Sequence, residues 1–183
     1  EMHVDGFRFD EGSVLSRGED GAPLEHPPVI WSIELDDLLG QSKVIAEAWD
    51  AAGLYQIGSF PGARWAEWNG KYRDCIRNFI KGKPGIIGEV AGRITGSADL
   101  YQGRHHEPTN SVNFVTAHDG FTLYDLTAYN EKHNWANGEG NNDGIDDNVS
   151  WNCGEEGETQ DQWINDLRKR QVKNFATIHM LSM

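Results

Sequence analysis

The chain has 183 residues, of which 38% are hydrophobic and 10% aromatic, a proportion that predicts a globular core and excludes a disordered chain. Lysine and arginine number 16 against 29 aspartates and glutamates, and the resulting net charge of −13 disfavours nucleic acid and anionic membrane surfaces as partners. No segment approaches the roughly 20 apolar residues of a membrane-spanning helix, and residues 1–5 lack the features of a signal peptide, so we expect a protein that is neither membrane-bound nor secreted.

Strand-length apolar runs alternate with helical stretches along the chain, a pattern typical of strand-helix units around a parallel sheet in an α/β protein. In chain order we expect a strand at 3–10, a helix at 28–39, strands at 43–47 and 65–68, a helix at 72–81, a strand at 112–117 and a helix at 163–181. The first helix is expected to end at Gly40, where a left-handed C-cap is cheap.

Four strands are half of what a (β/α)8 TIM barrel contains, and a complete barrel takes about 250 residues. We therefore expect residues 1–183 to be part of such a barrel, about strands 4 to 7 with their helices. Only two cysteines occur, Cys75 and Cys153, and their distant positions indicate neither a disulfide framework nor a zinc site. This favours a reducing compartment, and no metal or cofactor is expected.

Three of the expected strands have a carboxylate at their C-terminal edge: Asp10 and Glu47 are the last residues of their strands, and Asp119 follows the strand at 112–117 after His118. The carboxyl ends of barrel strands carry the active-site residues. Alternation along the first strand places Arg8 on the face of Asp10, and the cation should keep this acid ionised. Glu47 lies among apolar residues, which should raise its pKa and hold a proton on it.

Two acids with pKa values shifted in opposite directions suit retaining glycoside hydrolysis, which needs a nucleophile and a proton donor about 5 Å apart. The third acid, Asp119, and its neighbour His118 could bind hydroxyl groups of the same sugar. One acid at a strand end is more often a helix cap or a turn residue. Three such acids together favour the catalytic interpretation.

The segments around these acids also resemble a known family. They are HVDGFRFD at 3–10, KVIAEAWD at 43–50 and FVTAHDGF at 114–121, and they are similar to three signature segments of the α-amylase superfamily, glycoside hydrolase family 13. The resemblance implies that Asp10 is the nucleophile, Glu47 the general acid/base and Asp119 the stabiliser of the transition state. It implies substrate contacts for Arg8 and His118.

Three further segments resemble isoamylase-type and glycogen-debranching enzymes: EWNGKYRD at 67–74, NGEGNNDG at 137–144 and SWNCGEEGE at 150–158. This resemblance implies a retaining hydrolase for α-1,6 branch points of glycogen, amylopectin or limit dextrin, in a bacterial cytoplasm or a plastid stroma. The family's first signature segment and its eighth strand are missing from the chain, so the isolated segment is expected to be inactive. Its oligomeric state is left open.

Two other functions remain open at this point. A member of the same superfamily could cleave α-1,4 bonds or transfer glycosyl groups, and product analysis on branched and linear glucan would separate these activities. A non-catalytic glucan-binding subunit is a second alternative, but a binding protein has no need of all three carboxylates.

Aromatic residues after the second strand could stack on glucose rings, although core packing is the commoner role for any one of them. We expect Trp49, Tyr55 and Trp65 to be substrate-binding residues. The polar loop at 137–148 resembles the start of a calcium loop, but Ser150 stands where a bidentate glutamate is needed, so a polar rim loop is favoured. The basic run at 168–170 is expected on a solvated helix face.

Overall fold

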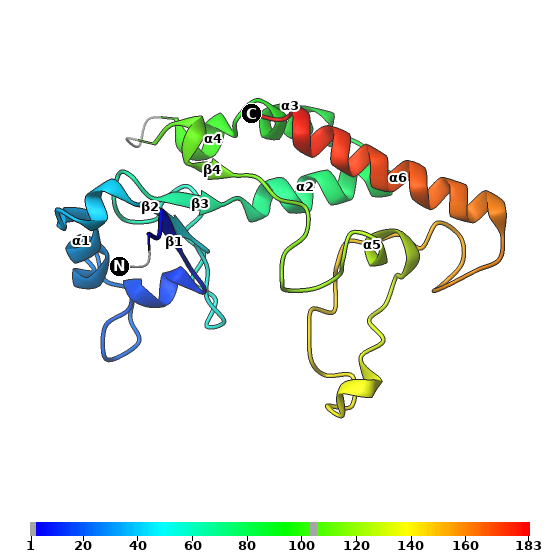
Figure 1. Ribbon diagram of the computed structural model, residues 1–183, viewed down its shortest axis with the longest axis horizontal. Coiled ribbons are helices and arrows are strands. Elements are labelled where there is room, and N and C mark those ends of the chain that lie inside the picture. The colour runs from blue at the N-terminus through cyan, green and yellow to red at the C-terminus, as the bar shows by residue number, and fades with distance from the viewer. Residues whose placement is uncertain (1–2, 103–105) are drawn as a thin grey trace. The chain divides into compact units, whose positions relative to one another are not determined.

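The computed structural model describes residues 3–102 and 106–183 and shows a mixed α/β protein with one parallel sheet (Figure 1). The sheet has the order β1-β2-β3-β4, with the strands β1 (Gly6–Phe9), β2 (Lys43–Ala46), β3 (Ala66–Trp68) and β4 (Ser111–Val112). Neighbours in the sheet are thus neighbours in sequence, which is the strand order of a barrel wall.

The chain divides into two compact units. Unit 1 comprises Glu1–Gly70, Thr95–Asn113 and Met183 and holds the whole sheet, whereas unit 2 comprises Lys71–Ile94 and Phe114–Ser182. The helices in chain order are α1 (Pro28–Leu35), α2 (Gly70–Lys81), α3 (Ile87–Ile94), α4 (Ala98–Tyr101), α5 (Asp125–Ala128) and α6 (Gln162–Leu181). The described residues also form the 3₁₀ helices η1 (Gly12–Ser16), η2 (Leu39–Gln41), η3 (Pro108–Asn110) and η4 (Trp135–Asn137).

The register of the sheet decides which side chains share a face. Arg8 pairs with Ile45, and Ile45 pairs with Ala66, so these three side chains and Trp68 lie on one face. The two strands β1 and β2 approach so closely at Gly6 that a Cβ there would lie 2.6 Å from the carbonyl oxygen of Lys43. A glycine is therefore required at this point of β1.

The opposite face of the sheet carries the core of unit 1. Phe9, Val44 and Ala46 pack there against α1, α4 and the segment that precedes β3. Trp65 is fully buried in this core, and its ring centre lies 5.1 Å from that of Phe9 and 5.1 Å from that of Phe60. Trp65 therefore packs the sheet, through Phe9, against the loop that contains Phe60.

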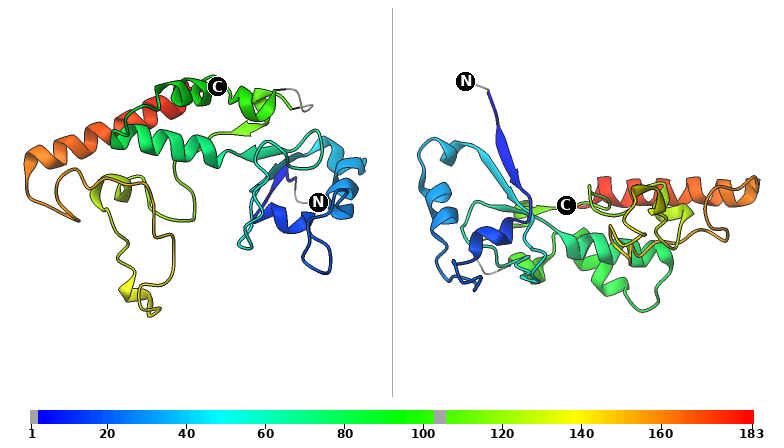
Figure 2. Two further views of the ribbon diagram at one scale, coloured as in Figure 1. Left: turned by 180° about the vertical axis from the view of Figure 1, so that it is seen from behind. Right: turned by 90° about the horizontal axis from the view of Figure 1, so that it is seen from below.

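The core of unit 2 lies between α2, α3 and α6, which run side by side in the views of Figure 2. Its buried members are Tyr72, Cys75, Ile76, Val90, Val115, Leu126 and Phe175. Both cysteines are free thiols buried in this unit, and burial raises the pKa of each, that of Cys75 to about 11.

The expected strands and helices at 3–10, 43–47, 65–68, 72–81 and 163–181 all have counterparts in the structure, within a few residues at either end. The strand expected at 112–117 is much shorter, because β4 ends at Val112. The amide of Asn69 donates to the carbonyl oxygen of Val112 at 2.9 Å, and α2 begins at the next residue, Gly70. Beyond Val112 the described residues therefore offer no neighbouring strand.

The helix expected at 28–39 ends at Leu35, so the C-cap predicted at Gly40 is wrong. The side chain of Asp36 accepts hydrogen bonds from the amides of Leu38 at 2.9 Å and Leu39 at 2.8 Å. An aspartate that binds amides ahead of it offers the backbone an alternative to the helical ladder. Gly40 consequently lies inside η2.

The solvated face expected for the basic run at 168–170 is contradicted at its first residue. Arg168 is only 2% exposed, and its guanidinium donates to the carbonyl oxygens of Asn152 and Glu155.

Within the described residues, no helix is both long enough and apolar enough to cross a membrane.

Replacing Trp65 by alanine tests the core of unit 1. We expect Trp65→Ala to lower the free energy of unfolding by about 3 to 5 kcal/mol, because the large buried ring would leave a cavity between Phe9 and Phe60. Denaturant unfolding of the full-length protein measures the loss. The matched control is Trp163→Ala, which removes a ring that is 66% exposed and should change stability by less than about 0.5 kcal/mol. Equal losses would contradict the packing described.

Candidate active site

Asp10 and Glu47 follow directly on the adjacent parallel strands β1 and β2, and the sheet brings them together. The amide of Glu47 donates to the carbonyl oxygen of Phe9 at 3.0 Å, which continues the ladder to this point. One carboxylate oxygen of Asp10 lies within 4.8 Å of one of Glu47. Two acids at this separation can act on the same small group of a substrate.

Arg8 lies between the two acids and holds both. Its Nη1 atom is 3.0 Å from Oδ2 of Asp10, and its Nη2 atom is 3.0 Å from Oε1 of Glu47. The guanidinium carbon lies 4.1 Å from the ring centre of Trp68, an arrangement typical of cation–π contacts. One fixed cation therefore offsets the charge of the acid pair, and Trp68 fixes the cation.

Glu47 occupies a buried environment, with only 1% of its surface exposed. Its Oε2 atom accepts a hydrogen bond of 2.8 Å from the amide of Glu11, a residue held in the left-handed region at φ 43°. Burial raises the pKa of Glu47 above its ordinary value and the adjacent Asp10 adds to this, while the Glu11 amide and Arg8 act in the opposite direction. The predicted rise of this pKa agrees with that direction.

Asp10 differs from Glu47 in its exposure, because 60% of its side chain is accessible to solvent. It lines a cavity of about 540 Å³ together with Arg8, Phe9, Glu11, Val14 and Leu15. The site thus contains an open carboxylate paired with a cation and a buried carboxyl whose environment favours the protonated form. Such a pair can supply a nucleophile and a proton donor.

A second arginine fixes the loop that follows Glu47. The Nε and Nη2 atoms of Arg17 donate to the two carboxylate oxygens of Asp50 at 2.6 and 3.0 Å. Asp50 also accepts from the amide of Leu54, and Arg17 holds the pKa of Asp50 below its usual value. This bidentate ion pair holds the loop between β2 and β3 against the segment that follows β1. The backbone next to Asp10 and Glu47 is therefore held in place.

The three aromatic residues expected to bind substrate have different environments. Trp49 stacks on Tyr55, with ring centres 6.3 Å apart and an interplanar angle of 20°, and Tyr55 is 49% exposed. Sugar contacts by these two residues stay a prediction. Complete burial of Trp65 contradicts its predicted role, since a ring packed between core side chains cannot stack on a sugar.

His118 and Asp119 belong to unit 2, where they lie next to each other with 3.6 Å between His118 Nε2 and Asp119 Oδ1. About half of each side chain is exposed, 47% for His118 and 51% for Asp119. Their convergence with the acids of unit 1 stays a prediction.

Sequence reasoning missed the residues that act on the acid pair through its surroundings. Glu11 contributes a backbone amide, and Trp68 supports the arginine. Trp68 could have been found by aligning the expected strands in register, because alternation puts it on the face of Arg8. No pattern in the sequence marks the left-handed conformation of Glu11.

The chain is similar over its whole length to three curated proteins from plants and bacteria. It is 60% identical over 183 residues to isoamylase 3, chloroplastic, of Oryza sativa subsp. japonica, and 52% identical over 202 residues to isoamylase SU1, chloroplastic, of Zea mays. It is 49% identical over 182 residues, 99% of the chain, to the glycogen debranching enzyme of Serratia proteamaculans. The chain spans about a quarter of the length of these relatives, between 23% and 27%. No family model matches it.

Removing the cation from the acid pair tests its electrostatic role. Since Arg8 lowers the pKa of Glu47, Arg8→Gln should raise this pKa, and the carboxyl should keep its proton to a higher pH. Carbon-detected NMR titration of the Glu47 carboxyl in the full-length protein measures the change. Lys43→Gln is the matched control, because it removes an exposed cation of β2 that does not act on the pKa of Glu47. A pKa of Glu47 that falls in Arg8→Gln would contradict the assignment.

Proposed function

We propose that the chain belongs to a glycoside hydrolase that cleaves α-1,6 branch points. The proposal starts from the similarity of the chain to isoamylases and a glycogen debranching enzyme, which agrees with its motifs. The substrate is a branched α-glucan such as glycogen, amylopectin or limit dextrin. One observation carries the chemistry: a buried carboxyl with a raised pKa lies beside an exposed carboxylate held by Arg8.

Cleavage proceeds by double displacement with retention of configuration. Asp10 attacks the anomeric carbon while Glu47 gives its proton to the departing glycosidic oxygen, so that the sugar becomes an ester of Asp10. Glu47 then takes a proton from water, whose oxygen attacks the same carbon and releases Asp10. The short separation of the acids supports this route, because inverting enzymes hold their carboxyl groups about 6.5 to 9.5 Å apart.

Asp119 and His118 complete the site in this proposal. The Asp119 carboxylate binds ring hydroxyl groups and stabilises the positive charge of the oxocarbenium-like transition state, while His118 donates a hydrogen bond to the same sugar. Arg8 contributes through its two ion pairs, since its guanidinium holds Asp10 and Glu47 in place side by side. Trp49 and Tyr55 offer the stacked aromatic pair that a glucan chain would contact.

The chain forms about strands 4 to 7 of a (β/α)8 barrel, within a catalytic domain whose first signature segment and last strand lie outside residues 1–183. The parallel order β1-β2-β3-β4 and the quarter-length match to the relatives support this assignment. We place the enzyme in a plastid stroma or a bacterial cytoplasm, in keeping with the chloroplastic relatives in rice and maize.

Amide substitutions test the roles of the two acids in the complete enzyme. Glu47→Gln removes the proton donor and should lower kcat by about 10² to 10⁴-fold, and Asp10→Asn, which removes the nucleophile, should leave almost no turnover. Release of reducing ends from amylopectin measures both. Glu19→Gln changes an exposed glutamate of unit 1 and should retain full activity. Normal turnover in either acid variant would overturn the assignment.

The products test the bond and the stereochemistry independently of any variant. We expect linear chains from amylopectin, none from unbranched amylose, and an α configuration of the newly formed reducing ends, seen by proton NMR before mutarotation. Products from amylose would show α-1,4 activity instead, and β reducing ends would show inversion.

A further inference from the structure

His118 and Asp119 lie on a segment of unit 2 that has no regular structure. Residues 116–120 belong to no helix or strand of the described chain, and about half of each of the two side chains is exposed. A group that stabilises a transition state has to be held accurately, because a displacement of about 1 Å can cost about 10²-fold in rate. The contacts at the two ends of this segment therefore bear on the reaction.

Arg77 of α2 reaches the first end of the segment directly. Its Nε atom donates to the carbonyl oxygen of Val115 at 2.8 Å, and the Val115 side chain packs in the core of unit 2. Arg77 is itself only 3% exposed. The carbonyl group just before residues 116–120 is thus fixed from the interior of the unit.

The same guanidinium reaches the second end of the segment through Asn148. Its Nη1 atom donates to the carbonyl oxygen of Asn148 at 3.0 Å. The buried side chain of Asn148 in turn accepts from the amide of Phe121 at 2.9 Å and donates to the carbonyl oxygen of Ile145 at 2.9 Å. A Cβ at Gly120 would collide with Oδ1 of Asn148, so the backbone passes close to this side chain. One arginine therefore holds the residue before the segment and, through Asn148, the residue after it.

Arg77 stays charged in this buried position. Burial and the neighbouring Arg73 lower its pKa to about 10, while Asp74 acts in the opposite direction, so the guanidinium keeps its proton at neutral pH. A charged donor makes stronger hydrogen bonds than a neutral one. A guanidinium presents several donors in one rigid plane, whereas the ammonium of lysine is a single point of charge. Two separate carbonyl oxygens are therefore served by arginine and not by lysine.

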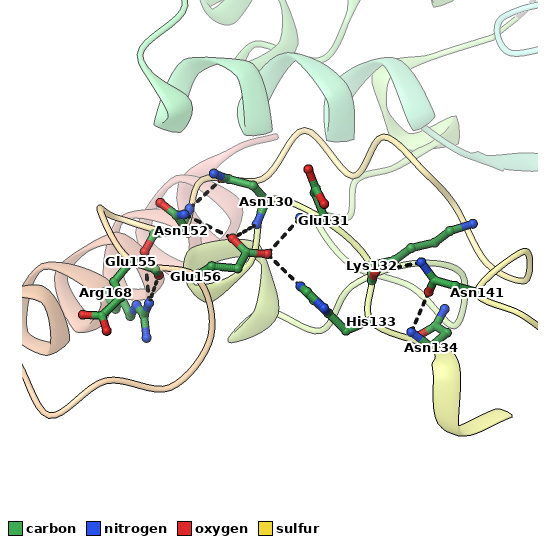
Figure 3. A network of polar contacts seen from close by, with 10 residues as sticks. All are labelled: Asn130, Glu131, Lys132, His133, Asn134, Asn141, Asn152, Glu155, Glu156 and Arg168. Carbon is green, nitrogen blue, oxygen red and sulfur yellow. Dashed lines mark hydrogen bonds and ion pairs between the residues drawn. The ribbon is translucent and has the colours of Figure 1, made fainter.

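Unit 2 contains a second buried arginine that holds a loop in the same way, Arg168 of α6 (Figure 3). Its guanidinium donates to the carbonyl oxygens of Asn152 and Glu155, and its exposed fraction of 2% is close to that of Arg77. The loop that Arg168 holds carries neither His118 nor Asp119. A comparison of the two arginines thus separates loop stability from an effect on the reaction.

We propose that Arg77 is a positioning residue of the reaction, which holds the Asp119 carboxylate at the sugar by fixing the backbone at Val115 and at Asn148. The inference rests on the proposed function, in which Asp119 stabilises the transition state, and it adds a residue that itself touches no substrate. Loss of one of the two hydrogen bonds leaves the glucan bound but lets the Asp119 carboxylate move. The rate therefore falls more than the affinity for the substrate.

Replacing Arg77 by lysine tests this role in the complete enzyme. Arg77→Lys keeps the positive charge but does not serve both carbonyl oxygens, so kcat on amylopectin, expressed per folded enzyme, should fall about tenfold or more. KM should change less than about threefold. Arg168→Lys is the matched control, and its kcat should stay within about threefold of the wild type. Denaturant unfolding gives the folded fraction of each variant, and equal kcat values in the two variants would contradict the inference.

A cationic inhibitor separates positioning from stability alone. The amino sugar 1-deoxynojirimycin carries a positive charge like that of the oxocarbenium-like transition state, so its Ki should rise about tenfold in Arg77→Lys and stay unchanged in Arg168→Lys. A smaller fraction of folded enzyme alters neither Ki nor KM. A Ki for Arg77→Lys equal to that of the wild type overturns the inference.

Asn148→Ser decides the matter if Arg77→Lys does not fold. The shorter hydroxyl group does not reach the amide of Phe121, so the link from Arg77 to the second end is cut without burying a new charge. The kcat of this variant should also fall about tenfold, and a wild-type kcat would reject the inference.

The same assays distinguish this inference from the proposed function. If the wild-type enzyme releases no chains from amylopectin, the proposed function fails. If the wild type is active and Arg77→Lys turns over as fast as Arg168→Lys, the proposed function stands and only the role of Arg77 is rejected.

Discussion

The arrangement of the site depends on one guanidinium. Arg8 pairs with Asp10 and Glu47 at 3.0 Å each and rests on the ring of Trp68, so a single side chain joins residues contributed by β1, β2 and β3. Two carboxylates at this separation would repel each other without a cation between them. The parallel register makes the contact possible, because it places Arg8, Ile45 and Ala66 side by side on one face.

The features that could be predicted from the sequence are those that depend on the pattern of apolar and polar residues within one segment of the chain. The apolar run before Glu47 predicts both a buried strand and a raised pKa, and the helical periodicity of α2 is visible in its sequence. Other features depend on partners distant in sequence. β4 is short because β3 ends at Trp68, and Trp65 belongs to the core because Phe9 and Phe60 enclose it.

Unit 2 reaches its order by a different means from unit 1. Outside α2, α3, α5, α6 and a short 3₁₀ helix, its described backbone forms long loops, which polar side chains hold in place of strand ladders. Arg77 and Arg168 are buried and donate to loop carbonyl oxygens, while Glu156 and Asn148 accept from loop amides. The polar residues that predict a rim loop are therefore also the residues whose side chains hold that loop in place. The sequence does not show which backbone amide each side chain binds, because that depends on the fold.

Both thiols of the chain lie in unit 2, and unit 1 has none. Alkylating and disulfide reagents react with the thiolate, and a pKa of about 11 leaves on the order of one Cys75 in ten thousand ionised at neutral pH. Burial excludes the reagent as well. The speed of thiol labelling therefore reports how often unit 2 opens, without any contribution from the sheet that carries Asp10 and Glu47, and it does so with the cysteines that the chain already has.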